Sequence, residues 1–199
     1  MVVKVLGVNA SPHRNGATVS LVEEVLQEAR KYGAETKLIH LYDYNIKRCL
    51  GCLVEDVKKC NPDTCTSSPL DDDFKKVVDE ILWADAVVFG TPVWWYNIPG
   101  ILKDLLDRMT SYENTPVKYF DGKVAVLVAS AGEDGSTSAL VPLMITLNHM
   151  GFAFPPFAMT YINGKKHISE DGEAVSYARR MGRNIVTYVE KMGDQKWWG

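Results

Sequence analysis

Hydrophobic residues along the chain occur either in short continuous runs or in longer stretches with helical spacing. The short runs are rich in β-branched residues and have few polar positions, as expected of strands that are buried on both faces. The longer stretches repeat apolar residues every three or four positions, which is typical of amphipathic helices. The runs expected as strands are Val2–Val8, Thr36–Leu41, Ala86–Phe89, Val124–Val128 and Ala158–Ile162.

Helical stretches alternate with these predicted strands. Their apolar faces start at Val19, Phe74, Ile101, Leu140 and Val175. The second of these helices is expected to begin at Ser68-Pro69, with Ser as N-cap and Pro as first residue. Strands alternating with helices through right-handed crossovers predict an α/β fold, a doubly wound parallel sheet of about five strands with helices on both faces.

Composition is that of an ordinary globular protein, with 199 residues, 46% hydrophobic and 24% charged. We expect a single domain over residues 1–199, with an insertion at about 42–69 that is too long for a simple connection. The net charge of −3 provides no basic surface for nucleic acid. Without a signal-peptide cleavage site or a membrane-length apolar stretch, a cytoplasmic protein with no membrane partner is expected.

The first loop, Ser11–Thr18, joins the first strand to the first helix and is rich in small and polar residues. Backbone N–H groups at a helix N-terminus lack partners and attract anions. The hydroxyl groups of Ser11 and Thr18 would complete a phosphate site, together with the amide of Asn15. Arg14 adds a guanidinium. The alternative is an ordinary polar turn in which Thr18 or Asn15 caps the helix.

The aromatic loop, Thr91–Asn97, follows the third strand and contains Trp94, Trp95 and Tyr96 in succession. Three consecutive aromatic side chains cannot all face the core, and exposed aromatic patches usually mark a binding surface. Such a loop at a strand end suits a planar, largely apolar ring system. The alternative is a loop that buries two of the three aromatic side chains in the core.

The serine–glycine loop, Ser130–Gly135, follows the fourth strand and contains mainly small residues. Gly132 and Gly135 would allow backbone N–H groups to approach the edge of a ring closely. The alternative is a plain strand-to-helix turn with Ser136 or Ser138 as the helix cap.

The three loops are expected to meet, because ligands of a doubly wound sheet bind beyond the carboxyl ends of its strands. Together they offer donors for a phosphate, an aromatic flank and backbone donors. FMN has the matching phosphate, polar ribityl chain and flat tricyclic ring, so FMN is the predicted cofactor. No Gly-x-Gly-x-x-Gly and no Walker loop follows a strand, so a Rossmann dinucleotide site or a P-loop is not expected.

In these loops the chain resembles the flavodoxin-like NAD(P)H-dependent FMN reductase family, particularly its iron–sulfur flavoprotein branch. The first loop is similar to that family's Gly-Ser-Pro-Arg-x-Asn-Gly-Asn-Thr phosphate loop. Residues Gly90–Gly100, with Leu102-Lys103 and Asp107-Arg108, are similar to its second flavin loop and the helix after it. The resemblance extends from Val3 to about Gly135. The predicted cofactor-binding residues are Ser11, His13, Arg14, Asn15, Gly16, Ala17, Thr18, Thr91, Pro92, Val93, Trp94, Trp95, Tyr96, Asn97, Ser130, Ala131, Gly132 and Gly135.

Three positions depart from the family pattern. Ala10 replaces Gly, His13 replaces Arg, and Ala17 replaces Asn. Ala17 cannot supply the side-chain contact to phosphate or ribityl that Asn would make, whereas main-chain contacts there do not depend on the side chain.

The resemblance implies an oxidoreductase in which NAD(P)H reduces bound FMN, and the electrons pass to a flavin, a quinone, dioxygen or a metal centre. It also implies a homodimer or homotetramer. The chemistry belongs to the cofactor, so no catalytic side chain is predicted. A non-enzymatic flavodoxin-like carrier is the alternative, but Pro12, Arg14 and the small net charge of −3 favour the reductase group.

The four cysteines of the chain are Cys49, Cys52, Cys60 and Cys65, with the spacing C-x2-C-x7-C-x4-C. Four thiolates suit a [4Fe–4S] cluster or tetrahedral zinc. Iron–sulfur flavoproteins have a compact C-x2-C-x2-C, and Glu55 stands where its third cysteine would be. A cluster, zinc and a metal-free loop of redox-active thiols therefore all stay open, as does a metal-binding or redox-sensing module as the function of the chain.

Several other features are expected to be structural. His40, His149 and His167 have no metal-like spacing. Asp71-Asp72-Asp73 would favour the dipole in the first turn of a helix, and Lys103 with Asp107 would form a surface pair. Trp197-Trp198 would pack on the body or on another subunit, with a disordered tail as the alternative.

Overall fold

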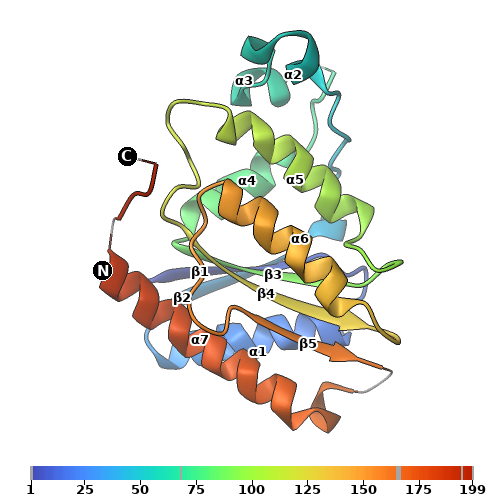
Figure 1. Cartoon of the computed structure of the whole chain (residues 1–199), viewed down its shortest axis with the longest axis vertical. Coiled ribbons are helices and arrows are strands. Elements are labelled where there is room, and N and C mark those ends of the chain that lie inside the picture. Colours follow the sequence, from blue (N-terminus) through green and yellow to red (C-terminus); the bar gives the residue numbers. More distant parts are fainter. Residues whose placement is uncertain (1, 68, 165–166, 194, 199) are drawn as a thin grey trace.

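The computed structural model describes residues 2–67, 69–164, 167–193 and 195–198. A five-stranded parallel sheet with the order β2-β1-β3-β4-β5 forms its centre (Figure 1). Its strands are β1 (Lys4–Asn9), β2 (Glu35–His40), β3 (Ala86–Pro92), β4 (Val124–Ala131) and β5 (Met159–Asn163). The predicted flavodoxin-like α/β fold, with its doubly wound parallel sheet, is confirmed.

The helices form a layer on each face of the sheet, as Figure 1 shows. One layer contains α1 (Ala17–Lys31) and α7 (Gly172–Met192). The other contains α4 (Phe74–Trp83), α5 (Gly100–Glu113) and α6 (Ser136–His149). Short helices and turns complete the described chain: η1 (Leu41–Asp43), α2 (Cys52–Glu55), η2 (Val57–Lys59), α3 (Pro62–Cys65) and η3 (Ile168–Glu170).

Each face of the sheet has its own hydrophobic core, because successive side chains of a strand point to opposite faces. Val8 and Phe89 belong to the core under α4, α5 and α6. Val5 and Val88, on the same strands, belong to the core under α1 and α7. This explains why the strands read as apolar runs rather than as an alternating pattern.

Helix α1 lies unusually close to the centre of the sheet. Val22 packs where two neighbouring strands each have a glycine, and a Cβ added to Gly7 or Gly90 would lie 2.7 Å or 2.3 Å from Val22. The missing side chains therefore determine how far α1 sits from β1 and β3.

The entry to α4 differs from the prediction. The helix begins at Phe74 with Asp73 as N-cap, so the expected start at Ser68-Pro69 was wrong, and Ser68 itself lies outside the described residues. The first turn of α4 contains no acidic residue, so the placement of Asp71-Asp72-Asp73 within that turn was wrong. Asp72 stands just before the helix, where it accepts the N–H of Phe74 at 3.1 Å and also forms a buried ion pair with Arg108 of α5.

Two other structural expectations are confirmed. Lys103 and Asp107 form an exposed pair one turn apart on α5. The backbone N–H groups of Trp197 and Trp198 donate to the carboxylate of Asp121 at 3.0 Å and 3.2 Å, so this segment packs on the body of the protein. Among the helices of the described ranges, none combines the length and the apolar character needed to cross a bilayer.

The contact between α1 and α7 provides a test of the packing. A Cβ on Gly182 would lie 2.4 Å from the backbone oxygen of Val25, so Gly182→Ala must push the two helices apart. We expect a loss of about 1–3 kcal/mol in the free energy of unfolding, measured by urea denaturation. Gly172→Ala in the same helix is the control, because nothing lies within 4 Å of its added Cβ. Equal stabilities for the two variants would contradict the close packing.

Candidate functional site

The three predicted loops meet at the carboxyl edge of the sheet. The Thr18 and Ser130 hydroxyl groups share a hydrogen bond of 2.6 Å, which joins the first loop to the serine–glycine loop. The N–H of Val93 donates to the carbonyl of Ser130 at 2.9 Å, which joins the aromatic loop to the same residue. The expectation that the three loops meet at one edge therefore agrees with the geometry.

The helices that follow the three loops, α1, α5 and α6, have no side-chain caps. The N-cap residues are Gly16 for α1, Pro99 for α5 and Gly135 for α6, and none of them accepts a backbone N–H through its side chain. The alternatives in which Thr18, Asn15, Ser136 or Ser138 caps a helix were therefore wrong. Uncapped N-termini leave backbone N–H groups and partial positive charge available to an anion.

The first loop borders an open hollow of about 480 Å³, which is lined by Pro12–Gly16. Ser11 is buried, and its hydroxyl accepts the N–H of His13 at 3.1 Å. His13, Arg14 and Asn15 are exposed. The guanidinium of Arg14 pairs with Asp43 of η1, so it ties the loop to the segment after β2.

The aromatic loop is a tight hairpin. The N–H of Trp94 donates to the carbonyl of Asn97 at 2.9 Å, and the reverse bond measures 3.1 Å. Trp95 and Tyr96 between them have positive φ of 51° and 61°, as in a type I′ turn. Trp94, Trp95 and Tyr96 are 47%, 95% and 61% exposed, so the alternative that two of them enter the core was wrong.

The serine–glycine loop is held by a small polar network. Asp134 accepts the N–H of Gly135 at 2.7 Å and the side-chain amide of Asn163 at 3.2 Å. The Ser136 hydroxyl donates to the Asn163 carbonyl oxygen at 2.6 Å. A Cβ on Gly135 would lie 2.8 Å from the ring of Tyr96, so this glycine lets the aromatic hairpin approach. The network keeps the N-terminus of α6 aimed at the site.

The remaining predicted site residues belong to the same edge. Thr91 and Pro92 end β3, and Ser130 and Ala131 end β4. The arrangement combines anion-binding backbone groups with an exposed aromatic flank. It can therefore hold a ligand that has a phosphate at one end and a flat ring at the other.

The cysteines are gathered beside α5. Cys60 and Cys65 are buried and Cys49 is exposed. Burial and the neighbouring thiols of Cys52, Cys65 and Cys49 raise the pKa of Cys60 to about 11. Ionisation of Cys60 is therefore opposed first by its burial and then by the charge that a neighbouring thiolate would carry. Among the described residues, no three His, Cys, Asp or Glu side chains are already arranged around one metal position.

A buried arginine anchors this cysteine segment. The Arg108 guanidinium pairs with Asp72, and its Nε lies 3.5 Å from the Cys65 sulfur. Further along α5, the side chain of Asn114 donates to the carbonyls of Val57 and Cys60 at 3.1 Å. With a rise of 1.5 Å per residue, these contacts lie about 12–21 Å along α5 from its start at the aromatic loop.

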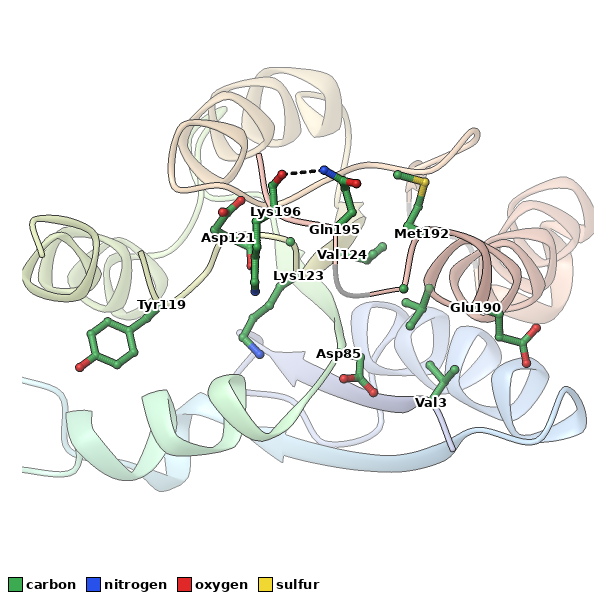
Figure 2. A pocket seen from close by; sticks show the side chains of 13 residues that line it. Val3, Asp85, Tyr119, Asp121, Lys123, Val124, Glu190, Met192, Gln195 and Lys196 are labelled. Atoms are coloured by element: carbon green, nitrogen blue, oxygen red, sulfur yellow. Dashed lines mark hydrogen bonds between the residues drawn. The ribbon is translucent and has the colours of Figure 1, made fainter. Parts of the chain in front are cut away.

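A second cavity lies at the opposite end of the strands. It has a volume of about 370 Å³ and is lined by the starts of β3 and β4 and the end of α7 (Figure 2). Lys123 reaches into it and donates to the carbonyls of Leu82 and Ala84 at 2.9 Å and 2.6 Å. Burial lowers the pKa of Lys123 to about 8, while Asp85 acts in the opposite direction.

Sequence reasoning missed the polar residues that support the loops. Asn9 and Asn163 end strands β1 and β5, where a polar residue after an apolar run could have indicated them. The pairing of Arg108 with Asp72 had no comparable signal, because 36 positions separate the two residues in the sequence.

Comparison with known proteins places these features in a family. A model of the NADPH-dependent FMN reductase family matches residues 3–165 of the chain. An iron-sulfur flavoprotein of Archaeoglobus fulgidus is 29% identical over 201 residues, covering 94% of this chain and 96% of the relative. An iron-sulfur flavoprotein of Methanocaldococcus jannaschii is 30% identical over 203 residues, covering 96% of this chain and 99% of the relative.

A solved structure supports the fold. RosB, in complex with the intermediate 8-demethyl-8-formylriboflavin-5'-phosphate, superposes with a TM-score of 0.81 and covers 100% of this chain and 83% of its own. The sequence identity is 19%, so the likeness concerns the architecture.

The environment of Lys123 predicts a dependence of stability on pH. Its pKa is about 8 in the fold and 10.5 in an ordinary environment, so the unfolded chain binds more protons between these values. The free energy of unfolding should therefore rise across this window, by up to about 3 kcal/mol, as the proton is lost. Urea denaturation at pH 7.5 and at pH 10 measures the effect.

The control compares two lysine variants. Lys123→Met should remove this rise, whereas Lys75→Met should retain it, because Lys75 is exposed and pairs with Asp79 on the surface of α4. If wild type and Lys123→Met gain the same stability between the two pH values, the buried amine does not cause the effect.

Proposed function

The chain belongs to the NADPH-dependent FMN reductase family, and on that premise we propose that it binds FMN in the three loops and transfers electrons from NAD(P)H to a planar acceptor. The observation that supports this most strongly is the meeting of uncapped helix N-termini with an exposed aromatic hairpin at one edge of the sheet. Bound FMN would supply the hydride and one-electron chemistry.

The residues at this edge fit the parts of FMN. The backbone N–H groups at the start of α1 would bind the phosphate, with the hydroxyl groups of Ser11 and Thr18 beside them. Ser130 and the backbone at Gly132 and Gly135 would donate to polar groups along the ribityl chain and the ring edge. The close approach that Gly135 permits brings Tyr96 against this loop, so that the aromatic side chains would flank the ring.

Anaerobic mixing with NADPH or NADH tests the activity. We expect rapid bleaching of the flavin absorbance, followed by its return when a quinone or free flavin is added. Bleaching by dithionite but not by either nicotinamide would indicate a non-enzymatic carrier instead.

A matched pair of substitutions tests the site. Thr18→Val keeps the shape of the side chain but removes the hydroxyl that bonds to Ser130. We expect a loss of about tenfold or more in FMN affinity, since a bond to a charged group is worth about 1.5–3 kcal/mol. Thr36→Val on β2 is the control, because the Thr36 hydroxyl is buried without a hydrogen-bond partner in the described structure. Equal affinities for the two variants would place the phosphate elsewhere.

The acceptor and the assembly are part of this proposal. A planar quinone or free flavin suits an open site whose aromatic flank is exposed. Association into a homodimer or homotetramer is supported by the exposed apolar side chains of Val141 and Ile145 on α6.

We further propose that Cys49, Cys52, Cys60 and Cys65 hold an iron–sulfur cluster. The support is the effect of the three neighbouring thiols on the pKa of Cys60 and the names of the archaeal relatives. Such a cluster would supply one-electron transfer. Electrons would then pass between this centre and the flavin, within one chain or across a subunit interface.

Iron and acid-labile sulfide, assayed on protein purified without oxygen, test the cluster. We expect about four of each per chain, and their loss in Cys52→Ser. Ser67→Ala in the same segment should retain them, since Ser67 is exposed and not a cluster ligand. Zinc without sulfide would favour the zinc alternative, and the absence of both metals would favour a metal-free thiol loop.

A further inference from the structure

The side chain of Asn9 holds the backbone of the first loop through hydrogen bonds. It ends β1 and is fully buried. Its side-chain oxygen accepts the N–H of Ser11 at 3.0 Å, and its amide nitrogen lies 3.2 Å from the Ser11 carbonyl and 3.4 Å from the His13 carbonyl. These bonds curl the loop over the end of the strand, as Asn side chains commonly do in tight turns.

His40 holds this asparagine from the neighbouring strand. The two residues are register partners in the β1–β2 ladder. The Nδ1 atom of His40 lies 2.9 Å from the amide nitrogen of Asn9, the shortest of the contacts made by that nitrogen.

The hydrogen-bond role of the His40 Nδ1 atom follows from the network. The Ser11 N–H requires the oxygen of Asn9 as its acceptor, so the amide group of Asn9 must face His40. An amide nitrogen only donates, and Nδ1 must therefore accept. In this network the Nδ1 atom of His40 therefore serves as the hydrogen-bond acceptor for the amide of Asn9.

We propose that His40 is a positioning residue for the flavin phosphate, acting through Asn9 on the backbone of the first loop. This inference rests on the proposed FMN site. His40 fixes the orientation of the Asn9 amide, and Asn9 fixes the turn that leads into the uncapped N-terminus of α1. The Arg14–Asp43 pair ties the same loop to η1, the segment that follows His40. A loop ordered before binding loses less conformational entropy when the phosphate arrives.

Two substitutions with two ligands test the inference. His40→Ala removes the acceptor, whereas the side-chain oxygen of His40→Asn occupies nearly the place of Nδ1 and restores it. We expect His40→Ala to weaken binding of FMN to the apoprotein by about tenfold or more, with riboflavin unchanged because it has no phosphate. His40→Asn should bind FMN within about threefold of wild type. Fluorescence titration measures all these affinities, and thermal melting checks that each variant is folded.

Other outcomes would overturn the inference. Equal FMN affinity in wild type and His40→Ala would show that the histidine does not support the loop, and an equal loss for FMN and riboflavin would show a general structural effect. If wild type binds neither flavin, the proposed function fails rather than this step. The histidine tautomer, read by nitrogen NMR on wild type, then decides separately: a proton on Nδ1 would exclude the network, and a proton on Nε2 would support it.

Discussion

The seating of Val22 of α1 on two glycines of the sheet is the contact on which the site depends. Without side chains at Gly7 and Gly90, α1 can lie directly against β1 and β3. Thr18 is one helical turn before Val22, so the same contact brings its hydroxyl to Ser130 at the end of β4. The distance between α1 and the sheet therefore determines where the uncapped backbone N–H groups at the start of α1 point.

Much of this arrangement could be predicted from the sequence, because it depends on local patterns. Apolar runs identify the strands, and the parallel order of the strands brings the three loops to one edge. Where the prediction was wrong, tertiary contacts outweighed local signals. Ser68-Pro69 has a local helix-start pattern, yet α4 begins at Phe74, after Asp72 has turned inward to a buried arginine.

The polar residues beneath the loops could not be found from local patterns. His40 and Asn9 become partners only through the register of two strands, and the histidine occurs without any motif. The position of the cysteine segment in the fold could not be found from local patterns either. The sequence spacing indicates a shared site, but the position of the segment along α5 follows from Arg108 and Asn114. Removing one partner from a buried ion pair is costly, so the Arg108–Asp72 pair makes this position a fixed property of the fold.

In the aromatic hairpin, exposed aromatic side chains stand on a backbone conformation that lowers the stability of the protein. Left-handed backbone at two successive residues with large side chains costs on the order of 1 kcal/mol or more each, and Asn-Gly would adopt the same turn with less strain. The chain nevertheless places Trp95 and Tyr96 there, with the indole of Trp95 almost wholly in solvent. Substitution of these two positions by small residues would be expected to raise the thermal stability of the protein. The hairpin therefore gives up stability at Trp95 and Tyr96 while it exposes flat aromatic surface at the edge where a ligand would bind.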